Sequence, residues 1–264
     1  MRLTLNISPC PNDKFMFDAI VNRRIDIAPF EFEVRYLDIE QLNAAVLEGG
    51  PAISKISYAV LPAISDRYRV LNSGSALGRG NGPLLVSRGD VDLSNPNLRV
   101  AIPGVHTTAN ALMTRLFPQV TDKVPMLFSE IAEAVERGVV DAGVLIHEGR
   151  FTYAARGLRL VADLGVEWER ATELPLPLGA IVASRQLPED VVMAFDELLH
   201  RSVEYAFRNP MISREYVKSH ARELADDVID SHIALFVNEF SLSLGDEGRR
   251  AVEALTGAQG LFLM

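Results

Sequence analysis

The pattern of apolar strands and amphipathic helices runs along this chain twice. The first copy, residues 3–70, opens with an apolar strand predicted over residues 3–7. The second copy, residues 98–162, opens with a similar strand predicted over residues 98–102. Each opening strand ends in a loop that leads into a helix, so the sequence predicts two similar α/β lobes. In open α/β sheets ligands bind at the carboxyl ends of the strands, and we expect a cleft between the lobes to hold the site.

The second helix of each copy has a recognisable start signal. Asp38, with Gln41 three residues later, predicts a capping box at the start of a helix over residues 38–47. Ser129 is expected to cap the matching helix over residues 129–137. The agreement between the copies therefore extends beyond their first strands.

Two short strands that resemble each other bracket the second copy. Residues 82–88 and 178–185 are both apolar, contain Gly and Pro at or before their start, and end in Ser-Arg. We interpret them as the two crossings of the chain between lobes. Domain one is then discontinuous, residues 1–86 and 185–264, and domain two is residues 87–184.

The C-terminal part is predicted to be helical and to pack on domain one. Apolar positions recur at helical spacing over residues 189–208, which predicts one buried face, and a further helix is expected over residues 231–244. His200, His220 and His232 lie in this part, and we interpret them as surface or packing residues.

Composition narrows the function classes. The 264 residues are 48% hydrophobic and carry a net charge of −9, which is typical of a globular protein and disfavours nucleic acid as a partner. The sequence has no apolar run long enough for a membrane span, and its first residues lack the apolar core of a secretory signal, so we expect a cytoplasmic protein. Cys10 is the only cysteine, which excludes an internal disulfide. Nothing in the sequence indicates the oligomeric state.

His147 is the main candidate for catalysis. It ends an apolar strand predicted over residues 142–147, at the position that Ser57 occupies in the first copy. An imidazole has an unperturbed pKa of about 6.5 and can act as a base near neutrality. A role in the core or at the surface is the alternative. His106 and His147 lack the spacing of common metal sites, so no metal is predicted.

Thr107 and Thr108 begin a helix after a strand and a glycine. The first turn of a helix has unpaired N–H groups and a partial positive charge, which favours a carboxylate there. The alternative is that one threonine only caps the helix. The equivalent place in the first copy contains Asn12 and Asp13, and the acidic Asp13 suits a cap and disfavours a second anion site.

Lys55 and Ser57 alternate along one strand and therefore point to the same face, where the lysine either meets a ligand or is solvated. Arg79 lies in the glycine-containing segment 78–82, which does not follow a strand as a dinucleotide fingerprint does. The sequence therefore predicts no cofactor.

Three further residues near these segments have a structural interpretation. Cys10 lies between two prolines without a recognisable base to activate it, so we favour a structural role. Arg150 and Tyr153 either orient a substrate or begin the next helix, and we favour the helix.

Four segments, residues 8–13, 55–58, 75–80 and 145–150, together resemble the 1,4-dihydroxy-6-naphthoate synthase family of the futalosine route to menaquinone. The resemblance implies a two-lobed fold like that of type II periplasmic binding proteins, with a central cleft and two crossing strands. It implies a lyase that needs no redox cofactor and acts on a small carboxylate, cyclic dehypoxanthinyl futalosine. Lys14 departs from the threonine that is common in the family at this position.

The resemblance also implies roles for individual residues. His147 would remove a proton from the sugar-derived part of the substrate, so that a three-carbon fragment leaves and the ring becomes aromatic. Two segments correspond to substrate-binding residues of the family, Lys55, Ile56 and Ser57 in the first and Thr107 and Thr108 in the second. Asn12 and Arg79, which lie in two of the matching segments, are also expected to bind the substrate.

Other functions remain open at this point. A non-catalytic solute-binding protein would share the fold, since fold does not dictate function. A chorismate-type dehydratase of the same pathway would share the architecture, but the segment at residues 8–13 disfavours it. A ligand-sensing domain of a transcription regulator would need a DNA-binding segment that the sequence lacks.

Overall fold

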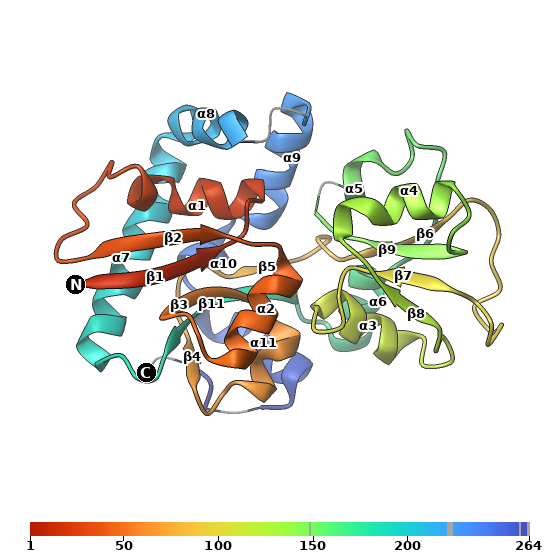
Figure 1. Cartoon of the computed structure of the whole chain (residues 1–264), viewed down its shortest axis with the longest axis horizontal. Coiled ribbons are helices and arrows are strands. Elements are labelled where there is room, and N and C mark those ends of the chain that lie inside the picture. Colours follow the sequence, from red (N-terminus) through yellow and green to blue (C-terminus); the bar gives the residue numbers. More distant parts are fainter. Residues whose placement is uncertain (148, 221–223, 259, 263–264) are drawn as a thin grey trace. The chain divides into compact units, whose positions relative to one another are not determined.

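The computed structural model has two compact units, which are described separately here because each has its own sheet (Figure 1). Unit 1 is residues 1–78 and 177–264, and unit 2 is residues 79–176. The structure describes residues 1–147, 149–220, 224–258 and 260–262.

Unit 1 is built on a mixed sheet with strand order β2-β1-β3-β11-β4, and β5 also pairs with β11. β1 is parallel to both β2 and β3, whereas β11 is antiparallel to β3 and β4. The strands are β1 (Arg2–Ile7), β2 (Glu31–Tyr36), β3 (Ile53–Ser57), β4 (Tyr68–Val70), β5 (Ala76–Gly78) and β11 (Leu176–Ser184).

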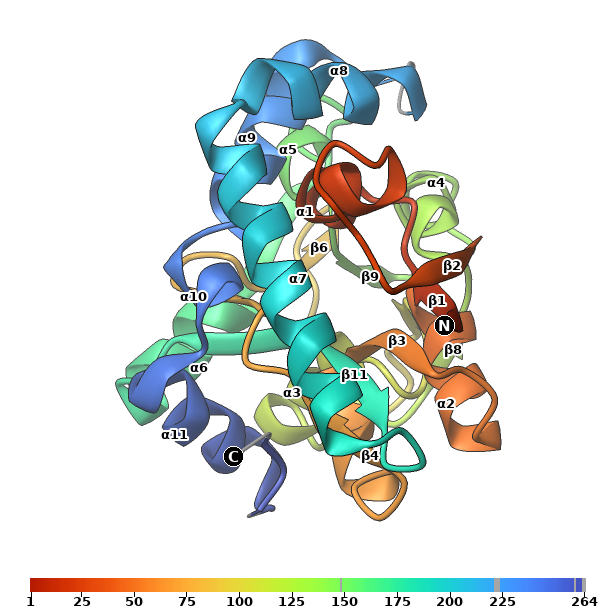
Figure 2. The same ribbon diagram turned by 90° about the vertical axis from the view of Figure 1, so that its left-hand side faces the viewer.

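Helices cover both faces of this sheet (Figure 1). α1 packs against α7, and α8 and α9 pack against α1, while α2 packs against β3 (Figure 2). The main core lies between the sheet and the α1–α7 pair, and it includes the fully buried Leu5, Phe17 and Phe195. The helices are α1 (Pro11–Val21), α2 (Ile39–Glu48), η1 (Tyr58–Ala63), α7 (Glu189–Arg208), α8 (Pro210–His220), α9 (Asp226–Phe236), α10 (Glu239–Leu242) and α11 (Gly245–Thr256).

Unit 2 has a second mixed sheet with strand order β10-β6-β9-β7-β8. β7 is parallel to β8 and β9, and β6 is antiparallel to β9 and β10. Its elements are β6 (Leu84–Ser87), β7 (Val100–Ile102), α3 (Thr108–Leu116), β8 (Lys123–Pro125), η2 (Phe128–Glu130), α4 (Ile131–Glu136), β9 (Ala142–Leu145), α5 (Gly149–Thr152), β10 (Arg159–Asp163) and α6 (Leu164–Thr172).

The two sheets repeat one plan, as the sequence predicts. In unit 1 the first strand lies between the second and the third, and the antiparallel β11 flanks the third. In unit 2 the order β8-β7-β9-β6 is the same arrangement. The flanking strands β6 and β11 are the two crossing segments that look alike in the sequence.

The predicted domain boundaries at 86/87 and 184/185 differ from the observed ones at 78/79 and 176/177. Each crossing strand pairs with the sheet that the chain enters, because a strand is stabilised by the ladder it joins. The boundary therefore falls before each crossing strand and not after it.

Several local predictions are confirmed and two are wrong. α7 has the predicted bounds, and Asp38 forms the predicted capping box with Gln41. Ser129 does not cap α4, because it lies inside η2 and the residue before α4 is Glu130. The predicted helix over residues 231–244 is interrupted, because α9 ends at Phe236 and the side chain of Asn238 caps α10.

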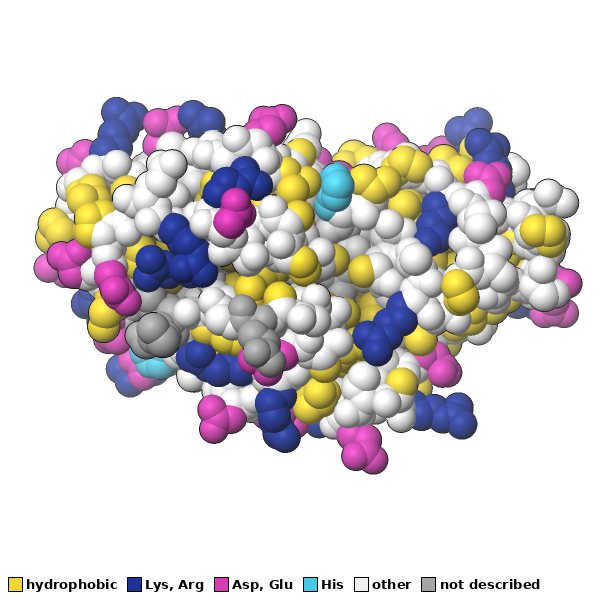
Figure 3. Space-filling view, turned by 90° about the horizontal axis from the view of Figure 1, so that it is seen from below, with side chains coloured by type: hydrophobic (Ala, Val, Ile, Leu, Met, Phe, Trp, Pro, Cys, Tyr) yellow, Lys and Arg dark blue, Asp and Glu magenta, His cyan; other side chains and the backbone are white. Residues whose placement is uncertain are grey.

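The surface seen in Figure 3 carries acidic and basic side chains that are interspersed with apolar ones. In the part of the chain that the structure describes, no helix combines the length and the apolar composition needed to cross a membrane.

Candidate functional site

A buried ion pair lies where α1 meets the end of β3 in unit 1. The Lys55 ammonium is 3.0 Å from Asp13 Oδ1, and neither residue is more than 5% exposed. Solvation, the alternative interpretation of Lys55, is therefore wrong. Breaking a buried pair by removing one partner typically costs about 3–5 kcal/mol, so the two side chains fix each other's position.

Asp13 also accepts hydrogen bonds from two neutral donors. The backbone N–H of Ser8 donates to Oδ2 at 3.0 Å, and the side-chain amide of Asn12 donates to Oδ1 at 3.1 Å. Asp13 thus closes the loop between β1 and α1 by reaching back to Ser8, while the N-cap position belongs to Cys10, whose side chain makes no capping bond. Cys10 is buried and its backbone N–H donates to Ser8 Oγ at 3.3 Å.

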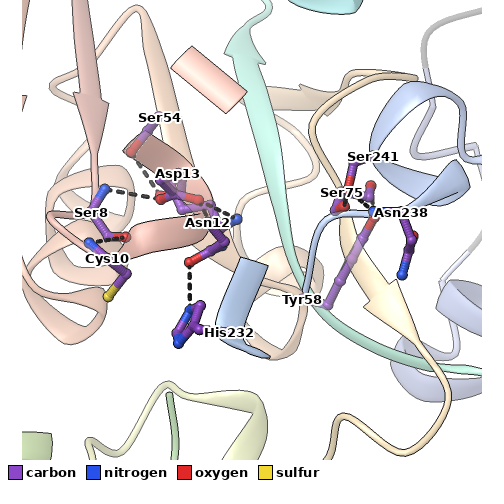
Figure 4. A network of polar contacts seen from close by, with 11 residues as sticks. Ser8, Cys10, Asn12, Asp13, Ser54, Tyr58, Ser75, His232, Asn238 and Ser241 are labelled. Atoms are coloured by element: carbon purple, nitrogen blue, oxygen red, sulfur yellow. Dashed lines mark hydrogen bonds and ion pairs between the residues drawn. The ribbon is translucent and has the colours of Figure 1, made fainter. Parts of the chain in front are cut away.

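Asn12 joins this ion pair to a distant histidine (Figure 4). Asn12 Oδ1 is 3.1 Å from Nε2 of His232, which is fully buried on α9. The imidazole also lies against the ring of Phe236, with 4.6 Å between the ring centroids. The sequence predicts only a surface or packing role for His232, because the two partners are 220 residues apart and no local pattern links them.

Ser57, the last residue of β3, is buried and held by Asn43 of α2. Asn43 Oδ1 accepts from the backbone N–H of Ser57 at 2.8 Å, and Asn43 Nδ2 donates to Ser57 Oγ at 3.0 Å. Since Ser57 Oγ accepts in this bond, the hydroxyl hydrogen is not used there. Asn43 is a further residue that the sequence analysis misses. Ile56 is fully buried and pairs with Ala180 of β11.

Gly179 on β11 leaves the space through which the Lys55 side chain passes. A Cβ atom at this position would lie 2.7 Å from the backbone oxygen of Ile56 and 3.0 Å from Lys55 Cε. The contact with the Ile56 oxygen is too short for real atoms and involves backbone that cannot easily move, and the contact with Lys55 is tight, so glycine suits this close approach of β11 to β3 and the lysine.

A second polar group in unit 1 lies beside α10 (Figure 4). The hydroxyl of Tyr58 is 2.7 Å from Ser75 Oγ, Ser241 Oγ donates to the backbone oxygen of Ser75 at 2.8 Å, and Asn238 Nδ2 donates to the backbone oxygen of Leu77 at 2.9 Å. Burial raises the pKa of Tyr58, so this phenol stays neutral. These bonds attach α10 to β5.

In unit 2, Thr107 is the N-cap of α3. Its Oγ1 accepts from the backbone N–H of Asn110 at 3.2 Å and donates to the backbone oxygen of Gly104 at 2.8 Å. The capping interpretation is confirmed, and the hydroxyl hydrogen is directed at Gly104. Both Thr107 and Thr108 are buried, so a ligand here would meet mainly the backbone N–H groups of the first turn.

His147 follows β9 by two residues and has a half-buried side chain. The predicted strand over residues 142–147 is thus shorter than expected and ends at Leu145. The backbone φ of His147 is +53°, a left-handed conformation that costs a non-glycine residue about 1–3 kcal/mol and is enriched at functional sites. Its ring meets the ring of Phe128 edge to face, with 5.1 Å between the centroids.

The turn after His147 is anchored by Arg150 of α5. Arg150 Nη2 lies 2.8 Å from Asp163 Oδ2, and Nη1 donates to the backbone oxygen of Gly82. Asp163 Oδ1 in turn caps α6 through the backbone N–H of Gly165. The prediction that Arg150 begins a helix is confirmed, and Tyr153 follows that helix and packs on the core of unit 2.

Arg79 lies at the start of unit 2 and is exposed. Its Nη2 donates to the backbone oxygen of Glu173, just after α6, at 3.1 Å. The next residue, Gly80, donates its N–H to Glu169 Oε1 at 2.7 Å. These bonds give the glycine-containing segment a structural role at the end of α6.

The fold of these two units is known from solved structures. A protein from Archaeoglobus fulgidus matches with a TM-score of 0.90 and 32% identity, covering 96% of this chain and 95% of that one. The alkanesulfonate-binding protein SsuA from Xanthomonas axonopodis pv. citri matches with a TM-score of 0.66 and 14% identity, covering 89% and 84%. The chain has the two-sheet fold of periplasmic binding proteins.

The sequence comparisons agree along nearly the whole chain. A family model described as menaquinone biosynthesis matches residues 3–259. A 1,4-dihydroxy-6-naphthoate synthase of Thermus thermophilus is 48% identical over 96% of this chain and 92% of its own length. The enzyme of the same name from Streptomyces coelicolor is 43% identical, covering 98% and 94%. The chain therefore belongs to the 1,4-dihydroxy-6-naphthoate synthase family of enzymes in menaquinone biosynthesis.

Proposed function

We propose that this protein converts cyclic dehypoxanthinyl futalosine to 1,4-dihydroxy-6-naphthoate and releases a three-carbon fragment. The names of the relatives from Thermus thermophilus and Streptomyces coelicolor support the product, since both match over more than nine-tenths of this chain. The observation that carries the chemistry is the position of His147, which is half-buried and left-handed, two residues after the end of β9.

His147 acts as the general base. An imidazole is neutral near pH 7 when its pKa is about 6.5, so it can accept a proton from the sugar-derived part of the substrate. Removal of that proton starts a retro-aldol-like or elimination sequence in which a three-carbon fragment departs and the remaining ring becomes aromatic. The ring of Phe128 beside the imidazole limits the rotation of the base.

Each unit offers groups that suit a small carboxylate. In unit 2, the N-terminus of α3 at Thr107 and Thr108 presents backbone N–H groups and a partial positive charge to the carboxylate. In unit 1, the ammonium of Lys55 has three N–H groups, and only one of them is needed for the bond to Asp13. The hydroxyl hydrogen of Ser57 adds a further donor, since its oxygen accepts from Asn43.

The test is incubation of purified protein with cyclic dehypoxanthinyl futalosine, without added redox cofactor, followed by mass spectrometry of the products. We expect 1,4-dihydroxy-6-naphthoate and the three-carbon fragment in equal amounts. Binding of the compound without turnover would favour a solute-binding protein instead. Dehydration of a chorismate-type substrate in a parallel reaction would favour the other enzyme of the pathway.

A further inference from the structure

We propose that His232 is a positioning residue for this reaction, which acts by holding the side-chain amide of Asn12 in a single orientation. The inference rests on the proposed function and on the substrate-binding role that the family resemblance implies for Asn12. Neither the family match nor the sequence pattern assigns a role in the reaction to His232, and the structure brings it to Asn12 from a separate helix (Figure 4).

The orientation of the Asn12 amide follows from its two neighbours. An ionised carboxylate can only accept hydrogen bonds, so the group that faces Asp13 Oδ1 at 3.1 Å must be the NH₂ end of Asn12. The carbonyl oxygen of Asn12 then faces His232 Nε2 at 3.1 Å. Since a carbonyl oxygen can only accept, His232 must carry a hydrogen on Nε2.

At the end of this arrangement opposite His232, charge fixes the position of Asp13. Asp13 holds the Lys55 ammonium at 3.0 Å and the backbone N–H of Ser8 at 3.0 Å, so its carboxylate has donors on both oxygens. The bonds then converge on Asp13, because His232 donates to Asn12, Asn12 donates to Asp13, and Lys55 also donates to Asp13. None of these four side chains belongs to a residue more than 5% exposed, and hydrogen bonds in such a low-dielectric setting reinforce one another.

Packing keeps the imidazole in place. α9 lies against α1, and Ile229 and Phe236, which flank His232 along α9, are both buried. The ring of Phe236 covers one side of the imidazole, so the ring cannot turn without displacing a packed phenyl group. α9 therefore does more than cover the core, because it places a donor at the first turn of α1.

Loss of the Nε2 donor would leave a buried carbonyl oxygen unsatisfied and would free the amide of Asn12 to rotate. His232→Leu removes the donor, whereas His232→Gln places an amide N–H near the position of Nε2. We expect His232→Leu to lower kcat/KM with the naphthoate precursor by about 10–100-fold, mainly through KM, which corresponds to about 1.4–2.8 kcal/mol at 1.4 kcal/mol per factor of ten. His232→Gln should recover most of that loss.

His200→Leu is the matched control, because this histidine also lies on a helix of unit 1 and bonds a backbone oxygen, that of Leu242, outside the arrangement. It should leave kcat/KM within about threefold. The double variant Asn12→Ala with His232→Leu should be no worse than Asn12→Ala alone, since coupled residues do not add. Wild-type kinetics in His232→Leu, equal losses in the Gln and Leu variants, or additive losses in the double variant would each overturn the inference.

A measurement on the unmodified protein separates this inference from the proposed function. In protein labelled with ¹⁵N-histidine, we expect the NMR signals of His232 to report a hydrogen on Nε2 from pH 6 to pH 8. A neutral ring with its hydrogen on Nδ1 would overturn the inference even if the wild type makes the naphthoate. An Nε2–H signal in a protein that fails to make the naphthoate would support the positioning of Asn12 and refute only the proposed reaction.

Discussion

The buried pair of Lys55 and Asp13 gives the prediction that the structure defines best. In Lys55→Met the methionine fills most of the volume of the lysine stem, but Asp13 keeps a negative charge in a fully buried position with only neutral donors. Removing one partner of a buried pair costs about 3–5 kcal/mol, and we expect the lower end of that range because Ser8 and Asn12 still donate. Asp13→Asn should lower the free energy of unfolding by a comparable amount, since it leaves the buried Lys55 ammonium without a counter-charge.

The decisive measurement is the double variant. If the two charges stabilise one another, Lys55→Met with Asp13→Asn should cost about 2–3 kcal/mol less than the sum of the single changes. Urea unfolding followed by far-UV circular dichroism gives these free energies, and Trp168, the only tryptophan and buried in unit 2, reports that unit separately by fluorescence. Losses that add to within about 0.5 kcal/mol would refute the coupling. Arg137→Met, which breaks the exposed pair with Glu133, is the control and should change little.

Four further outcomes follow from single positions. His147→Asn should retain substrate binding in calorimetry and lose about 10²–10⁴-fold in kcat, as expected for loss of a general base, and near-normal turnover would exclude this role. Thr107→Val removes the cap of α3 and should chiefly weaken substrate affinity, so a fall in kcat with unchanged affinity would place the carboxylate elsewhere. Gly179→Ala should cost about 1–3 kcal/mol in unfolding and raise KM, because the new Cβ would collide with the backbone oxygen of Ile56 and press on the Lys55 side chain, and unchanged KM would separate the course of that lysine from binding. Burial raises the pKa of Asp196, so the folded state disfavours the ionised carboxylate. This lowers the free energy of unfolding by its full amount at pH values above the pKa of Asp196 in the folded state. Asp196→Asn should therefore stabilise the protein at pH 7, and the gain should shrink as the pH falls through that raised pKa toward the ordinary aspartate range, which unfolding at a series of pH values can check.

The sequence predicts the repeated strands and helices because their signals are local. The apolar spacing of α7 and the capping pair Asp38 and Gln41 depend on residues within a few positions of one another. The domain boundaries are harder to predict from the sequence, because the sheet with which a crossing strand pairs decides on which side of the boundary that strand lies. Ser129 fails for a similar reason, since a short 3₁₀ turn competes with the expected cap.

The site shows the same division between local and distant information. The family resemblance draws attention to Lys55 and Ser57, whose segment is recognisable in the sequence. The resemblance does not identify Asn43 and His232, because their roles depend on partners that the fold brings to them, Ser57 and Asn12. An asparagine or a histidine inside a helix carries no mark in the sequence that separates such a role from packing.

The energetics of unit 1 connect these polar residues to function. A buried ion pair is a poor way to gain stability, because apolar side chains of similar volume often do as well or better. The first turn of α1 nevertheless holds Asp13 and Asn12 among buried partners on β3 and α9, and Gly179 leaves room for the lysine at the cost of a packed side chain. A fold under selection for stability alone would have filled this place with apolar residues, so we infer that these polar groups are retained because they present fixed donors and acceptors to a substrate.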